Sequence, residues 1–229
     1  MGLSGIEVLF AGSNFSRLMG GLAVSVRVSL LALLIGIPAG VVLGALWTLP
    51  SRAVDLALRL YLEFFRIIPT LVLLFLAYYI LPRELGFRVD GETVAMAAFA
   101  LWIAAEMSDI VRGALISVPL VQVEGARALA LGRLQQLRYV QLPQSLNLMV
   151  PATINLATRV IKTTSLLLLI SVVDVVNVGQ QIMEANRDRY PDAAFWVYSF
   201  IFVLYFVACY PLAAAANRLE FRAKERIHG

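Results

Sequence analysis

The chain is 229 residues long, with 60% hydrophobic residues, only 15% charged residues and a formal net charge of +4. This composition excludes an ordinary soluble domain, which needs more charge on its surface. The small positive excess does not indicate nucleic-acid binding either, because no basic patch on a soluble module accompanies it.

The hydrophobic residues gather in blocks long enough to cross a bilayer as helices, which takes roughly 20 residues. A chain inside lipid must satisfy its backbone hydrogen bonds internally, so these blocks predict helices. Residues 1–19 do not resemble a cleavable signal peptide, and we interpret them as a short amphipathic helix at a membrane surface. We therefore expect an all-α, polytopic membrane protein with one transmembrane domain over residues 1–229. The predicted spans are 20–47, 61–81, 93–117, 146–173 and 194–217.

Five spans place the two ends of the chain on opposite sides of the membrane, and basic residues favour the inner side. With the N-terminus outside, the inner segments hold eleven basic residues and the outer segments hold five. The inner ones are Arg52, Arg59, Arg66, Arg112, Arg127, Arg133, Arg138, Arg218, Arg222, Lys224 and Arg226. The outer ones are Arg17, Arg83, Arg88, Arg187 and Arg189. We therefore expect the N-terminus outside and the C-terminus in the cytoplasm.

The third predicted span carries Glu106, Asp109 and Arg112 near its inner end. Asp109 and Arg112 are three residues apart, a spacing that places two side chains on one face of a helix. We expect these two residues to form a structural ion pair that orients the entry to the following loop.

The longest connection, residues 118–145, is amphipathic, with apolar residues at helical spacing between positions 123 and 139. This pattern predicts a short helix at the inner membrane face. The helix should end before Leu142 and Pro143, because helical geometry is disfavoured for the residue that precedes a proline.

The fourth predicted span contains a polar stripe at helical periodicity. Its members are Asn155, Thr158, Arg159, Lys162, Thr163 and Ser165. Ionisable groups within a membrane cost about 2.5–3.5 kcal/mol each on insertion scales, so the two cations need a reason to be there. No acidic residue occurs in this span. The stripe therefore predicts either a path for an anionic group such as an amino-acid carboxylate, bound by Asn155, Arg159, Lys162 and Thr163, or a contact with a partner subunit.

Residues 118–145 resemble the cytoplasmic loop of importer-type ABC permeases, whose motif reads E-A-A, three residues, G, nine residues, I-x-L-P. The matching positions are Gln122, Glu124, Gly125, Ala126, Ala130, Leu142 and Pro143. Three residues depart from those frequent in the family: Val121 for glycine, Gly125 for alanine and Ala130 for glycine.

Three further motifs extend the resemblance to residues 20–222. Residues 65–69, FRIIP, are similar to F-R-x-x-P, and residues 108–114, SDIVRGA, are close to a sequence containing E-I-x-R-G. Residues 162–166, KTTSL, resemble K-D-T-S-L. Together these motifs resemble the polar amino-acid uptake subfamily of five-span permeases, the histidine, glutamine and glutamate type.

The resemblance implies a type I ABC importer permease in a bacterial inner membrane, whose loop is a coupling helix docked on a separate ATPase. It implies two ATP-binding subunits that use ATP and Mg, a second permease subunit, identical or related, and an extracytoplasmic binding protein that delivers the amino acid. This chain itself would bind no cofactor. The residues expected to couple it to the ATPase are Gln122, Glu124, Gly125, Ala126, Arg127, Ala130, Arg133, Leu142 and Pro143.

In this loop we expect Glu124, Arg127 and Arg133 at the ATPase contact, while Ala126, Leu129 and Ala130 pack inward. The alternative is a helix that lies on lipid headgroups. The family often has an acidic or amide residue where Thr163 stands, and its replacement favours acidic or neutral amino acids over basic ones.

The chain is not expected to be an enzyme, because the phosphate-binding motif G-x-x-x-x-G-K-[ST] does not occur in it. Its only histidine, His228, lies in the tail, so we expect neither a metal site nor a Ser/His nucleophile pair. An ATP-independent small channel or secondary transporter is the alternative function. Secondary transporters usually show inverted repeats, and none is visible here. Five helices are too few to enclose a gated path, so a dimer is expected.

Overall fold

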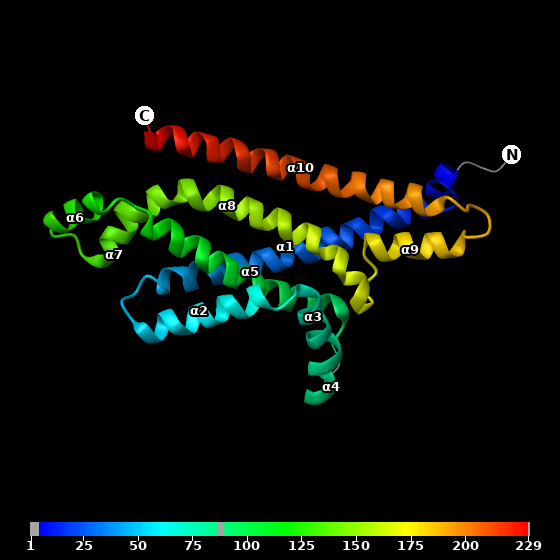
Figure 1. Ribbon diagram of the computed structural model, residues 1–229, viewed down its shortest axis with the longest axis horizontal. Helices are drawn as coiled ribbons and strands as arrows, with labels where there is room; N and C mark the ends of the chain where they lie inside the picture. Colours follow the sequence, from blue (N-terminus) through cyan, green and yellow to red (C-terminus); the bar gives the residue numbers. More distant parts are fainter. Residues whose placement is uncertain (1–4, 87–88, 229) are drawn as a thin grey trace. The chain divides into compact units, whose positions relative to one another are not determined.

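The computed structural model describes residues 5–86 and 89–228, and within these ranges the chain forms helices and no strands (Figure 1). The predicted all-helical class is thus confirmed. The longer α-helices are α1 (Asn14–Leu46), α2 (Arg52–Ile67), α5 (Gly91–Ile116), α8 (Leu142–Thr163), α9 (Val175–Ala185) and α10 (Ala193–His228). The shorter elements are η1 (Gly5–Leu9), α3 (Thr70–Phe75), η2 (Leu76–Ile80), α4 (Leu81–Leu85), α6 (Leu120–Ala128), α7 (Arg133–Gln136), η3 (Leu137–Gln141) and η4 (Thr164–Ile170). Arg88, which entered the orientation argument, lies outside the described residues.

Four helices in the described part of the chain are long and apolar enough to cross a membrane. They are Asn14–Leu46, Gly91–Ile116, Arg133–Ile170 and Ala193–Arg222. The pair Arg52–Ile67 and Thr70–Glu84 passes the same test together and adds a fifth if it counts as one span. The number of predicted spans therefore agrees with the upper count.

The second span departs most from its predicted limits of 61–81. Its first helix, α2, already begins at Arg52, where the side chain of Ser51 accepts a hydrogen bond of 3.5 Å from the Val54 N–H. The helix then ends at Ile67, and Ile68 is extended with φ −75° and ψ 124°. Pro69 explains the break, because its ring disfavours helical geometry at the residue before it.

The described residues form two compact units, each assembled from separated segments of the chain. Unit 1 comprises Met1–Ala32, Pro69–Phe99 and Arg159–Pro211. Unit 2 comprises Leu33–Ile68, Ala100–Thr158 and Leu212–Gly229. Neither unit is a continuous stretch of the chain. One transmembrane domain over residues 1–229 stays a prediction.

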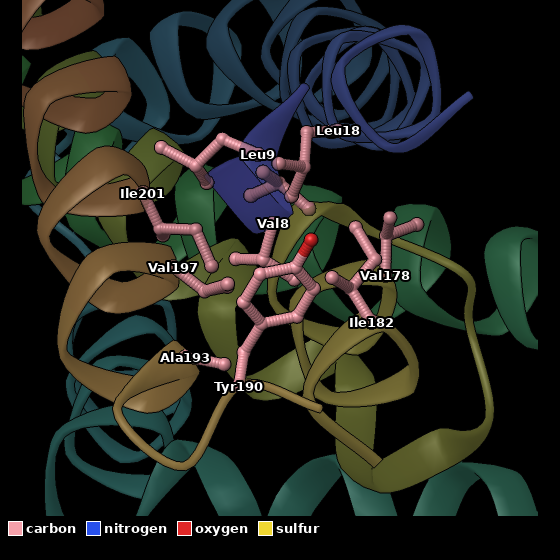
Figure 2. Close-up of a cluster of buried hydrophobic side chains, with 10 residues drawn as sticks. Val8, Leu9, Leu18, Val178, Ile182, Tyr190, Ala193, Val197 and Ile201 are labelled. Carbon is pink, nitrogen blue, oxygen red and sulfur yellow. The ribbon is translucent and has the colours of Figure 1, made fainter. Parts of the chain in front are cut away.

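Unit 1 contains a dense apolar cluster in which α9 lies beside the first turns of α10 (Figures 1 and 2). Its members are Val8, Leu9, Leu18, Val175, Val178, Ile182, Tyr190, Ala193, Val197 and Ile201. Figure 2 shows the ring of Tyr190 in the middle, with Val197 on one side and Val178 and Ile182 on the other. The close packing of these apolar side chains holds η1, α9 and the start of α10 together.

The N-terminal residues join this cluster and do not form the separate surface helix that the sequence predicts. They form the short turn η1, and α1 starts directly afterwards at Asn14, whose side-chain amide donates to the Val8 carbonyl at 2.7 Å. The carboxylate of Asp192 accepts from the Gly5 N–H at 3.3 Å and from the Trp196 indole N–H at 3.1 Å. These hydrogen bonds hold η1 against the start of α10.

Unit 2 is organised by a close approach between α1 and α5. A Cβ atom added to Gly36, Gly40 or Gly44 would lie 2.7, 2.8 or 2.6 Å from the carbonyl oxygens of Ala100, Ala104 and Ser108 respectively. The two backbones are thus in contact at every turn. Small residues four apart allow this packing between membrane helices, where dispersion and not the hydrophobic effect drives association.

Candidate functional site

The predicted coupling loop is built as two short helices, α6 and α7, that meet at a turn (Figure 1). Helix α6 follows Pro119, whose fixed φ suits the start of a helix. It ends at Ala128, well before the predicted limit near position 139. The loop is therefore helical, as expected, but it is not one continuous helix.

Ala130 creates the turn, because it adopts a left-handed backbone with φ 56°. The Leu131 N–H donates to the Ala126 carbonyl at 3.1 Å, and the Ala130 N–H donates to the Arg127 carbonyl at 2.9 Å. These two bonds form a Schellman motif, in which the residue at the position of Ala130 is usually glycine. The motif thus gives a physical reason why the family prefers glycine at this position of the loop.

Side-chain burial in the loop differs from what the sequence predicts. Val123 and Ala126 are the buried residues of α6. Leu129, expected to pack inward, is 77% exposed, and Ala130 is also exposed. The inward expectation was therefore wrong for these two residues, because the helix has already ended and the turn directs them outward.

Most of the other predicted coupling residues are exposed, as a docking surface requires. They are Gln122, Glu124, Gly125, Arg127, Arg133, Leu142 and Pro143. Leu120, Val121 and Leu134 are exposed as well, at 71%, 79% and 77%. Sequence reasoning missed these apolar residues as contact candidates. Large apolar side chains on a connection outside the spans were the available signal.

The second half of the loop runs without a break into α8. The predicted helix end before Leu142 and Pro143 was therefore wrong, because Leu142 is helical with φ −61° and ψ −47°. The Leu142 N–H instead bonds to the Leu137 carbonyl, five residues back, which makes η3 a π-turn. Such a turn widens the helix just ahead of Pro143, where a regular turn would bring the proline ring against a carbonyl.

The predicted substrate residues Asn155, Arg159, Lys162 and Thr163 all lie on α8. Asn155, Arg159 and Lys162 are exposed and Thr163 is half-buried. The Thr163 hydroxyl donates to the Arg159 carbonyl at 2.8 Å, so only its lone pairs remain available to a ligand. Thr158 and Ser165, the other hydroxyls of the stripe, likewise donate to backbone carbonyls of α8, those of Ile154 and Lys162. The exposed polar groups are thus an amide and two cations, which suit a carboxylate.

The acidic residues of α5 pair differently from the prediction. Arg66 at the end of α2 forks between them, with Nε 3.2 Å from Glu106 and a terminal nitrogen 2.7 Å from Asp109. Arg112, expected to pair with Asp109, lies instead over the Trp47 ring, 4.9 Å from its centre. The Asp109–Arg112 prediction was therefore wrong. Spacing within one helix does not reveal a partner on another helix.

Among the residues that the structure describes, no group of three or more His, Cys, Asp or Glu side chains could hold a metal ion.

Comparison with known proteins places these features in a family. Residues 36–225 match the family described as binding-protein-dependent transport system inner membrane component. The probable glutamine ABC transporter permease protein GlnP of Bacillus subtilis is 26% identical over 93% of this chain and 96% of its own. The octopine transport system permease protein OccM of Rhizobium radiobacter is 30% identical over 77% of this chain and 76% of its own.

A solved structure agrees with this match at the level of the fold. The crystal structure of an amino acid ABC transporter with histidines superposes with a TM-score of 0.85 at 24% identity, over 97% of this chain and all of that chain. The inward-facing MetNI methionine ABC transporter superposes with a TM-score of 0.65 at 21% identity, over 91% of this chain. The expected type I importer permease fold is thus confirmed.

Proposed function

The chain belongs to the family of binding-protein-dependent transport system inner membrane components, and from this premise we propose that it is the permease subunit of an ATP-driven importer of a polar amino acid. Family members are transport subunits of the inner membrane and not enzymes. The family match carries the proposal, because it spans the loop and the polar helix α8 together.

The loop supports coupling to a separate ATPase. It presents the 77%-exposed Leu129 and Leu134 next to the charged Glu124, Arg127 and Arg133. An exposed apolar patch rimmed by polar residues is typical of a protein contact. Because this chain has no phosphate-binding motif, the partner would supply ATP hydrolysis with Mg.

Contacts within the protein also hold the loop in place, which it needs in order to transmit movement. Val123 and Ala126 anchor α6, and the Gln136 side chain donates to the Leu131 carbonyl at 2.6 Å across the turn. From η3 the chain continues directly into α8 without an extended residue. Movement of the loop by closing ATPase subunits would therefore be passed to α8, the helix that carries the polar residues.

The substrate assignment rests on α8. Arg159 and Lys162 offer cations for an α-carboxylate, and Asn155 offers an amide for a polar side chain. Two cations would repel a basic amino acid, so an acidic or neutral polar one is favoured. Permeases named for glutamine in B. subtilis and Escherichia coli, the latter 29% identical over 90% of this chain, are consistent with a neutral substrate. The alternative is an ionic contact with a partner permease.

The remaining parts of the importer follow from family membership. Two ATP-binding subunits, a second permease and an extracytoplasmic binding protein would complete the particle. The second permease can be a copy of this chain or a related one. The excess of basic residues on one side favours an orientation with the N-terminus outside and the C-terminus in the cytoplasm.

Loss of the apolar residues tests coupling. The variant Leu129→Asp with Leu134→Asp should lose ATPase subunits on purification and lose uptake, while the permease stays folded and in the membrane. Phe10→Asp, which also charges an exposed apolar side chain (66%) but in the N-terminal segment, is the matched control and should keep both. Full uptake by the loop variant, or uptake that survives a blocked ATP site, would instead favour an ATP-independent channel.

A screen of amino acids with the assembled complex tests the substrate. Lys162→Gln should raise the KM for a neutral or acidic amino acid about tenfold, equivalent to about 1.4 kcal/mol of lost interaction. Ser165→Ala is the matched control, because that hydroxyl is already bonded to the Lys162 carbonyl. Preference for arginine or lysine would overturn the substrate assignment, and dissociation of the permease pair by K162Q would support the alternative.

A further inference from the structure

Asp174 is a buried carboxyl group that no step of the proposed transport function uses. Asp174 is fully buried, and its side chain caps the N-terminus of α9. One carboxyl oxygen, Oδ1, accepts a hydrogen bond of 2.9 Å from the Asn177 N–H. The other, Oδ2, has no hydrogen-bond partner among the residues that the structure describes. An ionised carboxylate left half-unsatisfied in a dry site is costly, which makes the group unusual.

Neighbouring elements cover Asp174 from solvent. On α1 the facing residue is Gly21, where an added Cβ would lie 2.9 Å from the Asp174 carbonyl carbon. On η4 lies the fully buried Thr164, whose hydroxyl is 3.2 Å from the Tyr205 hydroxyl of α10. The start of α9 is thus in contact with α1, and η4 packs against the same helix.

The charged groups on these elements have other partners or face outward. Arg17 of α1 donates to Gln181, Arg27 of α1 pairs with Glu92, and Asp192 before α10 accepts from Gly5 and Trp196. Glu7 of η1, Lys162 before η4 and Glu184 of α9 are exposed. The Tyr205 phenol of α10 also interacts electrostatically with Asp174. None of these groups forms a salt bridge with Asp174.

We propose that Asp174 is a proton-binding site, and that its protonation tightens the packing of α9 while its ionisation loosens it. A neutral carboxylic acid avoids the cost of burying a charge, whereas the carboxylate keeps one oxygen without a donor. The site goes beyond the proposed transport function. With the N-terminus outside, α9 lies on the outer side, where it would respond to external acidity.

The direction of the pH effect follows from the environment of the group. Burial raises the pKa of Asp174 to about 6 from its ordinary 3.8, although the N–H groups of Asn177 and Val176 act in the opposite direction. The folded state therefore holds its proton to a higher pH than the unfolded chain does. Protonated Asp174 therefore contributes to the stability of the folded state. This contribution is complete below about pH 4, falls as the pH rises toward 6 and is absent above pH 6.

Infrared titration of the purified full chain in detergent tests proton binding directly. The C=O absorption of a protonated carboxylic acid should disappear with a midpoint near pH 6 in the wild type. This component should be missing in Asp174→Asn. Asp188→Asn, which changes an exposed aspartate, is the matched control and should retain it. A wild-type midpoint near the ordinary pKa of an aspartate, or a component unchanged in D174N, would overturn the proposal.

Thermal unfolding provides the second measurement. The melting temperature of the wild type and of D188N should fall between pH 4.5 and 7, whereas that of D174N should lose most of this fall. Asparagine is a good N-cap and keeps an oxygen for the Asn177 N–H, so D174N should fold. If it does not, the wild-type infrared midpoint still decides, because a midpoint near the ordinary pKa of an aspartate would overturn the proposal. An undiminished pH slope in D174N would contradict the proposal.

Discussion

Ala130 holds a backbone conformation that favours glycine, and the surrounding loop depends on it. Its φ of 56° lets the two Schellman hydrogen bonds close the end of α6. An alanine Cβ in left-handed geometry costs roughly 1–2 kcal/mol, because it approaches the neighbouring carbonyl oxygen. At Ala130 the two backbone hydrogen bonds therefore stabilise the loop, whereas the alanine side chain destabilises it.

Ala130→Gly should raise the free energy of unfolding by about 1 kcal/mol, since glycine adopts this backbone without strain. Thermal unfolding of the purified chain measures the effect. Ala128→Gly, at the last residue of α6 and also exposed, is the control and should lower stability slightly, because its backbone is helical and glycine weakens a helix. Equal losses in both variants would contradict a strained Ala130.

Arg66 neutralises two carboxylates on a neighbouring helix. Arg66→Met should lower stability by about 2 kcal/mol, because it removes the cation next to the nearly buried Glu106. Arg66→Lys should recover only part of the loss, since an ammonium cannot fork between two acids. Chemical unfolding in detergent checks the order of the variants. Arg59→Met breaks the exposed Arg59–Asp55 pair and should change stability by less than about 0.5 kcal/mol.

At the scale of elements, the glycines of α1 determine how closely α5 can pack. Gly36, Gly40 and Gly44 recur every four residues, a pattern visible in the sequence but not recognised there as a packing face. The sequence prediction concentrated on charged residues. The small residues that bring the backbones of α1 and α5 together are the better indication of how these helices pack.

Gly40→Leu should destabilise the packing of α1 on α5 by about 2–3 kcal/mol, since its Cβ alone would lie 2.5 Å from the Met107 Cβ and 2.8 Å from the Ala104 oxygen. The yield of folded protein and its melting temperature measure the loss. Gly20→Leu, on the same helix but with no atom within 4 Å of an added Cβ, should be tolerated. Similar behaviour of both variants would argue against close packing at Gly40.

At the scale of the whole molecule, orientation in the membrane remains a prediction from basic residues. In a Cys209→Ala background, a cysteine at Asp188 should react with a membrane-impermeant thiol reagent in intact cells. A cysteine at Arg138 should react only after the cells are opened, because the predicted orientation puts the loop in the cytoplasm. Both positions are exposed, so access alone should decide. The reverse pattern would invert the topology and remove the loop from the ATPase.

The helical class, the approximate spans and the family could be predicted because their signals are local. A run of apolar residues predicts a span wherever its partners lie, and a motif such as Gln122 to Pro143 is recognised by its spacing alone. Boundaries were less predictable, as the early start of α2 and the unbroken passage through Pro143 show. In both cases backbone hydrogen bonding, which composition does not report, determined where the helix began or continued.

By itself the sequence determined that this chain crosses a membrane as helices and carries the loop of an importer permease, since hydropathy and motif spacing are properties of the chain. Only the tertiary structure decided that Arg66 and not Arg112 meets Asp109 and that Leu129 faces outward. It also decided that Asp174 is buried, with one carboxyl oxygen that has no hydrogen-bond partner among the residues described. The reason is that ion-pair partners and side-chain burial depend on which helices pack against each other. That packing is determined by contacts between residues far apart in the chain.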